Sequence, residues 1–189
     1  MSIRKVLAKR LSILVLTSLI LLGFGISAHA FSISGTVRDS SGVAITGMVG
    51  EIQVAVSQGD PCGLRQVLFS VAIDDSGNYT IPGLEAGYYY LQTWNLNLSD
   101  YINEWWTGDT DPSSYYCDDA VPVDLSGGDQ TGIDFKLTTG GSISGHVYES
   151  DGTTPIQGMW LNAFTGQCYQ NEVAWADTDE DGAFTLRGI

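Results

Sequence analysis

The sequence predicts an all-β protein, and three observations carry that prediction. Short runs rich in Val, Ile, Tyr and Thr alternate with turn-forming clusters such as "DSSG", "DDSGN" and "PGLEAG". This spacing is typical of an antiparallel β-sandwich. No stretch after residue 30 carries a sustained helical period, and the number of runs within residues 31–139 is enough to close one sandwich core.

The expected strands follow from these runs in order. They are predicted near residues 32–38, 48–57, 67–73, 78–81, 88–95, 120–124 and 131–137. Side chains alternate between the two faces of a strand, so residues two apart share a face. Six side chains are therefore predicted to be buried: Val37, Tyr79, Ile81, Tyr89, Leu91 and Phe135.

The chain also repeats itself. Residues 33–48, "ISGTVRDSSGVAITGM", match residues 143–159, "ISGHVYESDGTTPIQGM", after a one-residue gap, and "DDSGNYTIPGL" at 74–84 matches "DEDGAFTLRGI" at 179–189. A long repeat of this kind indicates a duplicated domain. We expect two tandem copies, residues 31–139 and residues 140–189, and we expect the second to be incomplete because Ile189 is the counterpart of Leu84.

The motifs "GTVRDSSGVAITG", "DDSGNYTIPGLEAGYYYL" and "GIDFKL" resemble the carboxypeptidase regulatory-like domain, an immunoglobulin-like, transthyretin-like or starch-binding-like sandwich with a carbohydrate-binding-like fold. The matching positions are Gly35, Val37, Asp39, Gly42, Ile45, Gly47, Asp74, Gly77, Tyr79, Ile81, Gly83, Leu84, Ala86, Gly87 and Tyr89. The first copy departs from the pattern at Ala44, where a proline is usual, and the second copy has Pro155. The resemblance implies a fold and says little about function.

The N-terminal residues predict export. Four basic residues precede an apolar run from Leu11 to Leu22 and the triplet Ala28, His29, Ala30, so residues 1–30 are predicted to be a cleaved signal peptide. The run is too short and too interrupted for a membrane span. The expected location is secreted, periplasmic or on the cell surface. Cleavage leaves four basic against 22 acidic residues, a net charge of −18, which disfavours nucleic-acid and membrane-surface partners.

The three cysteines, Cys62, Cys117 and Cys168, lie in the exported part, where disulfides are favoured. Cys62 and Cys168 occupy matching positions in the two copies, and a counterpart of Cys117 would follow residue 189. We therefore predict a Cys62–Cys117 disulfide, with Cys168 unpaired in this sequence. The alternative is a Cys62–Cys168 bridge between the copies.

Aromatic residues are the candidate ligand-binding groups. If Tyr89 and Leu91 face the core, neighbouring rings on the same strand face outward, and the segment "YINEWWTGDTDPSSYYC" adds further rings. Exposed rings suit the apolar faces of sugars. The candidates are Tyr88, Tyr90, Trp94, Trp105 and Trp106. The competing interpretation is that these rings pack against the sandwich or the next repeat.

Catalytic and metal sites have less support. His146, in an alternating strand, is expected to be a solvated surface residue, and no nucleophile and base stand at a recognisable spacing. Asp177, Asp179 and Asp181 resemble the opening of a calcium loop, but Gly188 stands where a bidentate Glu is needed. We expect an acidic turn there, with calcium as the weaker alternative and no other cofactor.

The sequence thus favours an exported, non-catalytic module, a binding or accessory domain with carbohydrate as the leading ligand class. Two alternatives remain open. The first is a structural spacer or adhesion stalk, whose partner would be another cell-surface protein. The second is an accessory domain of a hydrolase encoded downstream. Asn78 and Asn97 begin N-x-Thr and N-x-Ser sequons, whose use the sequence leaves open.

Overall fold

The computed structural model describes residues 30–108, 113–165 and 172–189. The regular elements in these ranges are strands and one short 3-10 turn, η1 (Cys117–Asp119). The strands are β1 (Phe31–Asp39), β2 (Ile52–Gly59), β3 (Arg65–Ala72), β4 (Asn78–Leu84), β5 (Tyr88–Asn95), β6 (Val123–Asp124), β7 (Phe135–Leu137), β8 (Ser142–His146), β9 (Trp160–Phe164), β10 (Glu172–Asp177) and β11 (Ala183–Arg187). The all-β class predicted from the sequence is confirmed.

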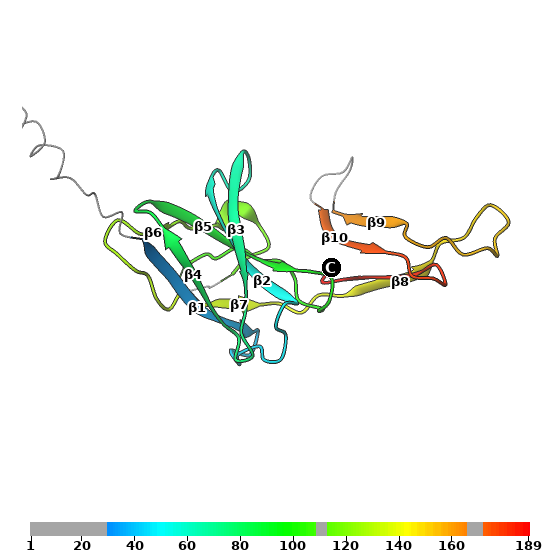
Figure 1. The fold of residues 1–189 in the computed structure, drawn as a ribbon, viewed down its shortest axis with the longest axis horizontal. Helices are drawn as coiled ribbons and strands as arrows, with labels where there is room; N and C mark the ends of the chain where they lie inside the picture. Colours follow the sequence, from blue (N-terminus) through cyan, green and yellow to red (C-terminus); the bar gives the residue numbers. More distant parts are fainter. Residues whose placement is uncertain (1–29, 109–112, 166–171) are drawn as a thin grey trace, which may run out of the picture.

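Strands β1 to β7 form a two-sheet sandwich (Figure 1). One sheet has the order β4-β1-β7 and the other has the order β3-β2-β5-β6. Neighbouring strands are antiparallel except β1 and β7, which run parallel with Val37 opposite Phe135. This pair departs from the antiparallel expectation because β6 ends in the second sheet, and the connection over residues 125–134 crosses back to lay β7 beside β1 in the same direction.

Strands β6 and β7 are both shorter than expected, and for β7 the reason is that two aspartates satisfy part of the β1 backbone. Asp129 Oδ1 accepts a hydrogen bond from the Ser32 amide at 2.7 Å, and Asp134 Oδ1 accepts one from the Thr36 amide at 2.8 Å. These carboxylates take the place of main-chain acceptors that a longer β7 would supply. Regular pairing therefore begins only at Phe135, although the chain already follows β1 from residue 129.

The core lies between the two sheets and contains all six side chains predicted to be buried. Phe135 and Val37 meet across the parallel pair, while Tyr79 packs its ring 6.1 Å from that of Phe135. Strands β1, β2, β4, β5 and β7 supply completely enclosed side chains, and Tyr79 and Tyr89 are almost as deeply buried. The enclosed side chains include Ile33, Val37, Ile52, Val54, Val56, Ile81, Leu91 and Phe135. Burial of apolar area on this scale is the main stabilising contribution to such a domain.

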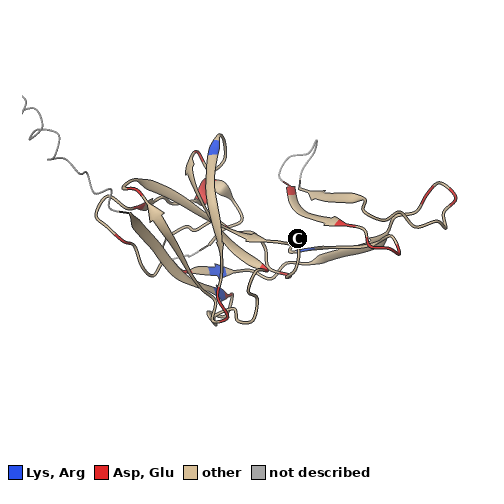
Figure 2. Ribbon diagram, viewed as in Figure 1, with Lys and Arg blue, Asp and Glu red and all other residues tan. Residues whose placement is uncertain are grey.

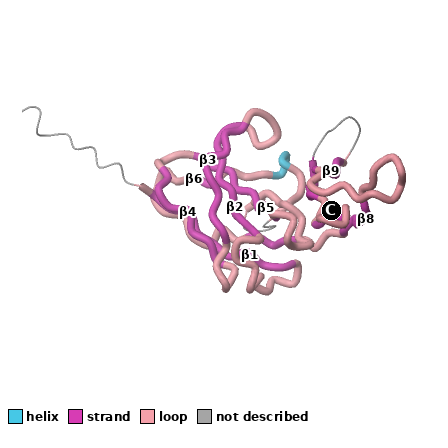
Figure 3. Tube along the Cα trace, turned by 45° about the vertical axis from the view of Figure 1, so that its right-hand side comes forward, coloured by secondary structure: helices cyan, strands magenta, loops and turns pink. Residues whose placement is uncertain are grey.

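Residues 142–165 and 172–189 form two further antiparallel pairs, β8 with β11 and β9 with β10, in a lobe beside the first sandwich (Figures 1 and 3). A small apolar cluster joins these pairs through Ala174, Ala176 and Leu186. The amide of Val147 donates to the oxygen of Gly182 at 2.8 Å, as the amide of Val37 does to Gly77. The domain boundaries and the second, incomplete copy remain predictions.

Gly77 shows why the repeated turn needs glycine. Its φ is +78°, and a Cβ there would lie 2.5 Å from the main-chain oxygen of Ile45. Both the backbone conformation and the space exclude a side chain. Gly182 meets the same restriction, with φ of +72° and the oxygen of Val147 at 2.5 Å.

The predicted signal peptide lies outside the described residues. Within the described ranges, no helix has the length and apolar character that a membrane span requires. Acidic residues occur in many of the turns, and basic residues are few (Figure 2).

Candidate functional site

The segment at residues 104–106 lies alongside β5 and extends its sheet. The Thr93 amide donates to the oxygen of Glu104 at 2.9 Å, and the Trp106 amide donates to the oxygen of Leu91 at 3.1 Å. Because the segment is extended, its side chains alternate between the two faces of the sheet. The aromatic stretch that follows β5 is therefore held by main-chain hydrogen bonds to the sandwich.

This alternation sends the two tryptophans in opposite directions. Trp106 is 7% exposed and belongs to the core cluster. Trp105 lies on the outer face, yet it is only 3% exposed because the guanidinium carbon of Arg65 sits 4.5 Å from its ring centroid. The expectation that both could be open sugar-stacking rings is corrected: Trp106 fills the sandwich, and Arg65 covers Trp105 through a cation–π contact.

The three candidate rings of β5 do face away from the core, as the alternation predicted. Tyr88 is 62% exposed, and Tyr90 and Trp94 are half-buried. Trp94 turns its indole Nε1 toward Gln92 Oε1, 3.2 Å away. The three rings thus form a strip along the outer face of β5. This strip is separate from a cleft beside residues 102–105, whose lining contains none of the three rings.

That cleft, about 350 Å³ in volume, lies between the aromatic segment and β10. Polar side chains and rings share its lining: Arg65, Gln92, Asn103, Trp105, Tyr115, Tyr116 and Glu172 contribute, with Pro61, Cys62, Gly63, Ile102, Cys117 and Val173. Tyr116 is 67% exposed, and its ring meets that of Tyr115 edge-on at a centroid distance of 5.4 Å. Mixed aromatic and polar linings of this kind suit polar organic ligands.

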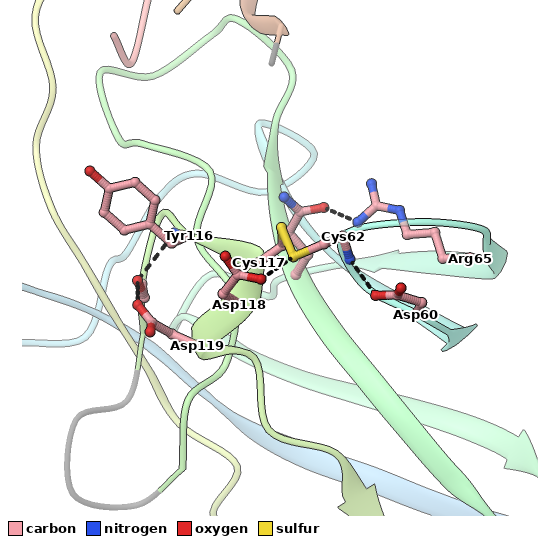
Figure 4. The surroundings of a disulfide bond; sticks show 9 residues. Asp60, Cys62, Arg65, Tyr116, Cys117, Asp118 and Asp119 are labelled. Atoms are coloured by element: carbon pink, nitrogen blue, oxygen red, sulfur yellow. Dashed lines mark hydrogen bonds between the residues drawn. A yellow bond between two sulfur atoms is a disulfide. The ribbon is translucent and has the colours of Figure 1, made fainter. Parts of the chain in front are cut away.

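A disulfide fixes one rim of the cleft. Cys62 and Cys117 are joined with a Cα–Cα distance of 5.2 Å, the pairing that the repeat predicted. Figure 4 shows the bridge between the β2–β3 loop, where Asp60 Oδ1 accepts from the Cys62 amide at 3.0 Å, and the turn that begins at Cys117. The loop and the aromatic segment are thereby tied together. Cys168 lies outside the described residues.

Gln92 connects the polar groups on the cleft wall. Its Oε1 accepts two hydrogen bonds, one from Arg65 Nη1 at 3.0 Å and one from Trp94 Nε1 at 3.2 Å. Partial burial lowers the pKa of the Arg65 guanidinium, which nonetheless stays charged at neutral pH. On the opposite wall Glu172 Oε2 accepts from Asn162 Nδ2 at 2.6 Å.

The loop after β5 connects the first sandwich to β11. Asn97 Nδ2 donates to the oxygen of Thr185 at 3.0 Å, and its Oδ1 accepts from the amide of Arg187 at 2.9 Å. Arg187 Nη1 also forms a 2.8 Å ion pair with Asp100. Asn97 adopts a φ of 62°, a conformation that asparagine tolerates better than most residues. The amide of this sequon is therefore engaged in the junction.

The acidic string before Gly182 forms a turn. Asp179 Oδ1 accepts from the amides of Asp181 and Ala183 at 3.0 and 2.9 Å, the same arrangement that Asp74 makes with Ser76 and Asn78 in the first sandwich.

Asp177, Asp179 and Asp181 are not brought together as a metal-binding group in the described part of the chain. In the described part of the chain, the group whose potential ligand atoms lie close enough together for a metal ion is Cys62, Cys117 and Asp118. Both sulfurs of that group are bonded to each other, so it offers no thiolate. His146 is exposed, as expected, and stacks on Tyr148 at 5.8 Å.

Comparisons with known proteins give structural neighbours only. No protein-family model matches the chain, and no curated protein matches it. Solved structures that align with it include the Bacillus anthracis TIE protein, at 17% identity and a TM-score of 0.38, and a Streptococcal ancillary pilin, at 14% and 0.39. A DUF3823 family protein from Bacteroides uniformis aligns at 12% identity and a TM-score of 0.41.

These alignments cover 82%, 86% and 80% of this chain, but 25%, 51% and 55% of the respective neighbours. The chain thus spans a quarter to about half of the length of each of these three proteins. At such identities and TM-scores the likeness carries no argument about function, and the resemblance to the carboxypeptidase regulatory-like domain remains a prediction.

Sequence reasoning missed the polar half of the cleft. Arg65 and Gln92 come from different strands, and Glu172 comes from the second lobe, so their meeting depends on tertiary contacts. One signal was available for Arg65, since it is one of only four basic residues after the predicted signal peptide. Glu172 had no comparable signal in a chain rich in acidic residues.

Proposed function

We propose that this chain is an exported, non-catalytic β-sandwich module that binds carbohydrate in the cleft between the aromatic segment and β10. The observation that carries the proposal is the convergence of tyrosine rings and hydrogen-bonding side chains on one cavity of about 350 Å³. The proposal moves the binding site away from the strip of Tyr88, Tyr90 and Trp94. It retains the ligand class favoured by the sequence.

The chemistry of the lining suits a sugar ring. The apolar face of a pyranose packs on an exposed aromatic ring, and Tyr116 offers such a ring at the cleft. Sugar hydroxyls both donate and accept, so they can use the carboxylate of Glu172, the amide of Asn103 and the guanidinium of Arg65. A short oligosaccharide would fit a cavity of this size, which lies near the lower end of the usual range for ligand sites.

The experiment is a titration of the intact protein with neutral and acidic oligosaccharides, in which binding is measured by calorimetry and by the change in tryptophan emission. Tyr116→Ala should weaken binding about tenfold, the equivalent of about 1.4 kcal/mol. Tyr88→Ala is the matched control, because Tyr88 is equally exposed and lies outside the cleft. We expect Kd values between roughly millimolar and micromolar for a site of this kind.

Three outcomes decide the proposal. If Tyr116→Ala weakens sugar binding and Tyr88→Ala does not, the cleft is the binding site. If only Tyr88→Ala weakens binding, the site lies on the outer strip of β5. Absence of binding across a broad glycan set would reject the carbohydrate proposal.

A second candidate function is a structural spacer, and the junction favours it. Asn97 forms one hydrogen bond with Thr185 and one with Arg187, and Asp100 forms an ion pair with Arg187, so three polar contacts hold β11 against the first sandwich. A spacer needs this stiffness, whereas a flexible tether does not. Small-angle scattering of wild-type protein and an Asn97→Gly, Asp100→Ala variant tests the candidate: a spacer of this design becomes more flexible when the contacts are removed.

A further inference from the structure

Arg65 holds an unusual place for a cation in so acidic a chain. The ion pairs among the described residues are Arg38–Asp134 and Arg187–Asp100, and Arg65 takes part in neither. Of the four basic residues after residue 30, Arg65 is the one that lines the cleft. Arg65 instead stacks on Trp105 and donates one hydrogen bond to a neutral amide, that of Gln92.

These contacts hold the guanidinium in place without neutralising it. Gln92 fixes one Nη, and Trp105 supports the flat face of the group at 4.5 Å. A guanidinium carries five N–H donors in a planar fork, so most remain available, and the group lines the cleft. A planar fork held in advance matches the two oxygens of a carboxylate.

We propose that the cleft recognises an acidic saccharide, and that Arg65 binds the carboxylate of a hexuronic acid residue. This inference rests on the proposed carbohydrate-binding function. Arg65 is then the specificity-determining residue of the site. Tyr116 supplies the stacking ring, and Glu172 on the other wall accepts hydroxyl hydrogens from the sugar.

The excess of acidic residues favours a short acidic ligand over a long one. The net charge of −14, which becomes −18 without residues 1–30, repels a long polyanion, but distant charges are screened beyond about 8 Å at physiological ionic strength. The direct contact with Arg65 therefore dominates for a short uronic acid oligomer. Longer oligomers bring additional carboxylates over a chain with an excess of acidic residues, and we expect no gain in affinity from their length.

The test compares trigalacturonic acid with its methyl ester, which has the same rings and no charge, and with cellotriose. Calorimetry on the intact protein should give the free acid an affinity at least about tenfold above that of the ester. Arg65→Gln should abolish the difference, while Arg65→Lys, which keeps the charge, should retain part of it. Arg38→Gln is the matched control, because Arg38 is paired with Asp134 outside the cleft, and it should leave the preference unchanged.

The possible results separate the two proposals. Equal affinity of the wild type for acid, ester and cellotriose, still weakened by Tyr116→Ala, overturns the uronic acid inference and leaves the carbohydrate function standing. Absence of binding to all three sugars overturns both. A preference for the acid that survives Arg65→Gln, in a variant with unchanged thermal unfolding, removes Arg65 from the role.

Discussion

The hydroxyl of Tyr79 donates a hydrogen bond to the main-chain oxygen of Ile133, 2.5 Å away inside the core. The bond ties β4 to the crossover that leads into β7, across β1. Burial, and to a smaller extent the charge of Asp134, raises the pKa of Tyr79 far above its usual range, so the hydroxyl keeps its proton. Gly35 lies beside this bond, and the position needs glycine because a Cβ there would collide with the same oxygen.

Replacing Tyr79 with Phe should lower the free energy of unfolding by about 1–3 kcal/mol, since the buried oxygen of Ile133 loses this donor. Urea denaturation measures the change. Tyr90→Phe is the control: Tyr90 is half-buried on the outward face of β5, so removal of its hydroxyl should cost little. Equal destabilisation by both substitutions would show that the Tyr79 bond has no special value.

The sequence was sufficient to predict the strands and the core of the first sandwich, because alternation of apolar residues is a local signal. Tyr79, Ile81, Tyr89 and Leu91 are buried as their spacing predicted. The parallel placement of β7 could not be predicted in this way, because it depends on how residues 125–134 cross between the sheets.

The candidate site was less accessible to sequence reasoning. The pairing of residues 104–106 with β5 decides that Trp106 enters the core while Trp105 faces Arg65, and this pairing is a tertiary contact. Cys62 and Cys117 were predictable because the repeat gave an argument independent of geometry. Side chains that meet only through the tertiary fold, such as Gln92 and Glu172, left no pattern in the sequence.

The disulfide should contribute strongly to stability. Closing a loop with a sequence separation of 55 residues corresponds to about 4 kcal/mol in the chain-entropy estimate. Replacing both Cys62 and Cys117 with Ser should lower the free energy of unfolding by an amount of this order, measured by urea denaturation. Cys168→Ser is the control and should have a small effect. A linked Cys62–Cys168 peptide in non-reducing mapping of the wild type would contradict the assignment.

Asp74 should make the first sandwich sensitive to acid. Hydrogen bonds from the amides of Asn78 and Ser76 lower the pKa of its carboxyl below the ordinary value of 3.8. When the pKa is lower in the folded state than in the unfolded state, the carboxylate stabilises the fold at any pH above the unfolded-state pKa. This stabilisation is lost as the pH falls through the folded-state pKa. The unfolding temperature should therefore be flat near neutral pH and fall below about pH 4.

The matched pair for this test is Asp74→Asn and Asp75→Asn. The carboxylate of Asp75 accepts no hydrogen bond from the described residues, whereas that of Asp74 accepts two from backbone amides. Asp74→Asn should lower the unfolding temperature at pH 7 and reduce its dependence on pH below 4. Parallel pH curves for Asp74→Asn and the wild type would mean that other carboxyls govern the acid transition.

The junction between the lobes should depend on Asn97. Asn97→Gly preserves the φ of 62° at no conformational cost and removes both side-chain hydrogen bonds to β11. The Arg187 amide, which donates to Asn97 Oδ1, should then exchange its hydrogen about tenfold faster, while amides of the β1–β4 pair keep their rates. Asn97→Asp is the control because it keeps an acceptor for the Arg187 amide and loses only the donor to Thr185. Unchanged exchange at Arg187 in Asn97→Gly would show that the lobes are held by other contacts.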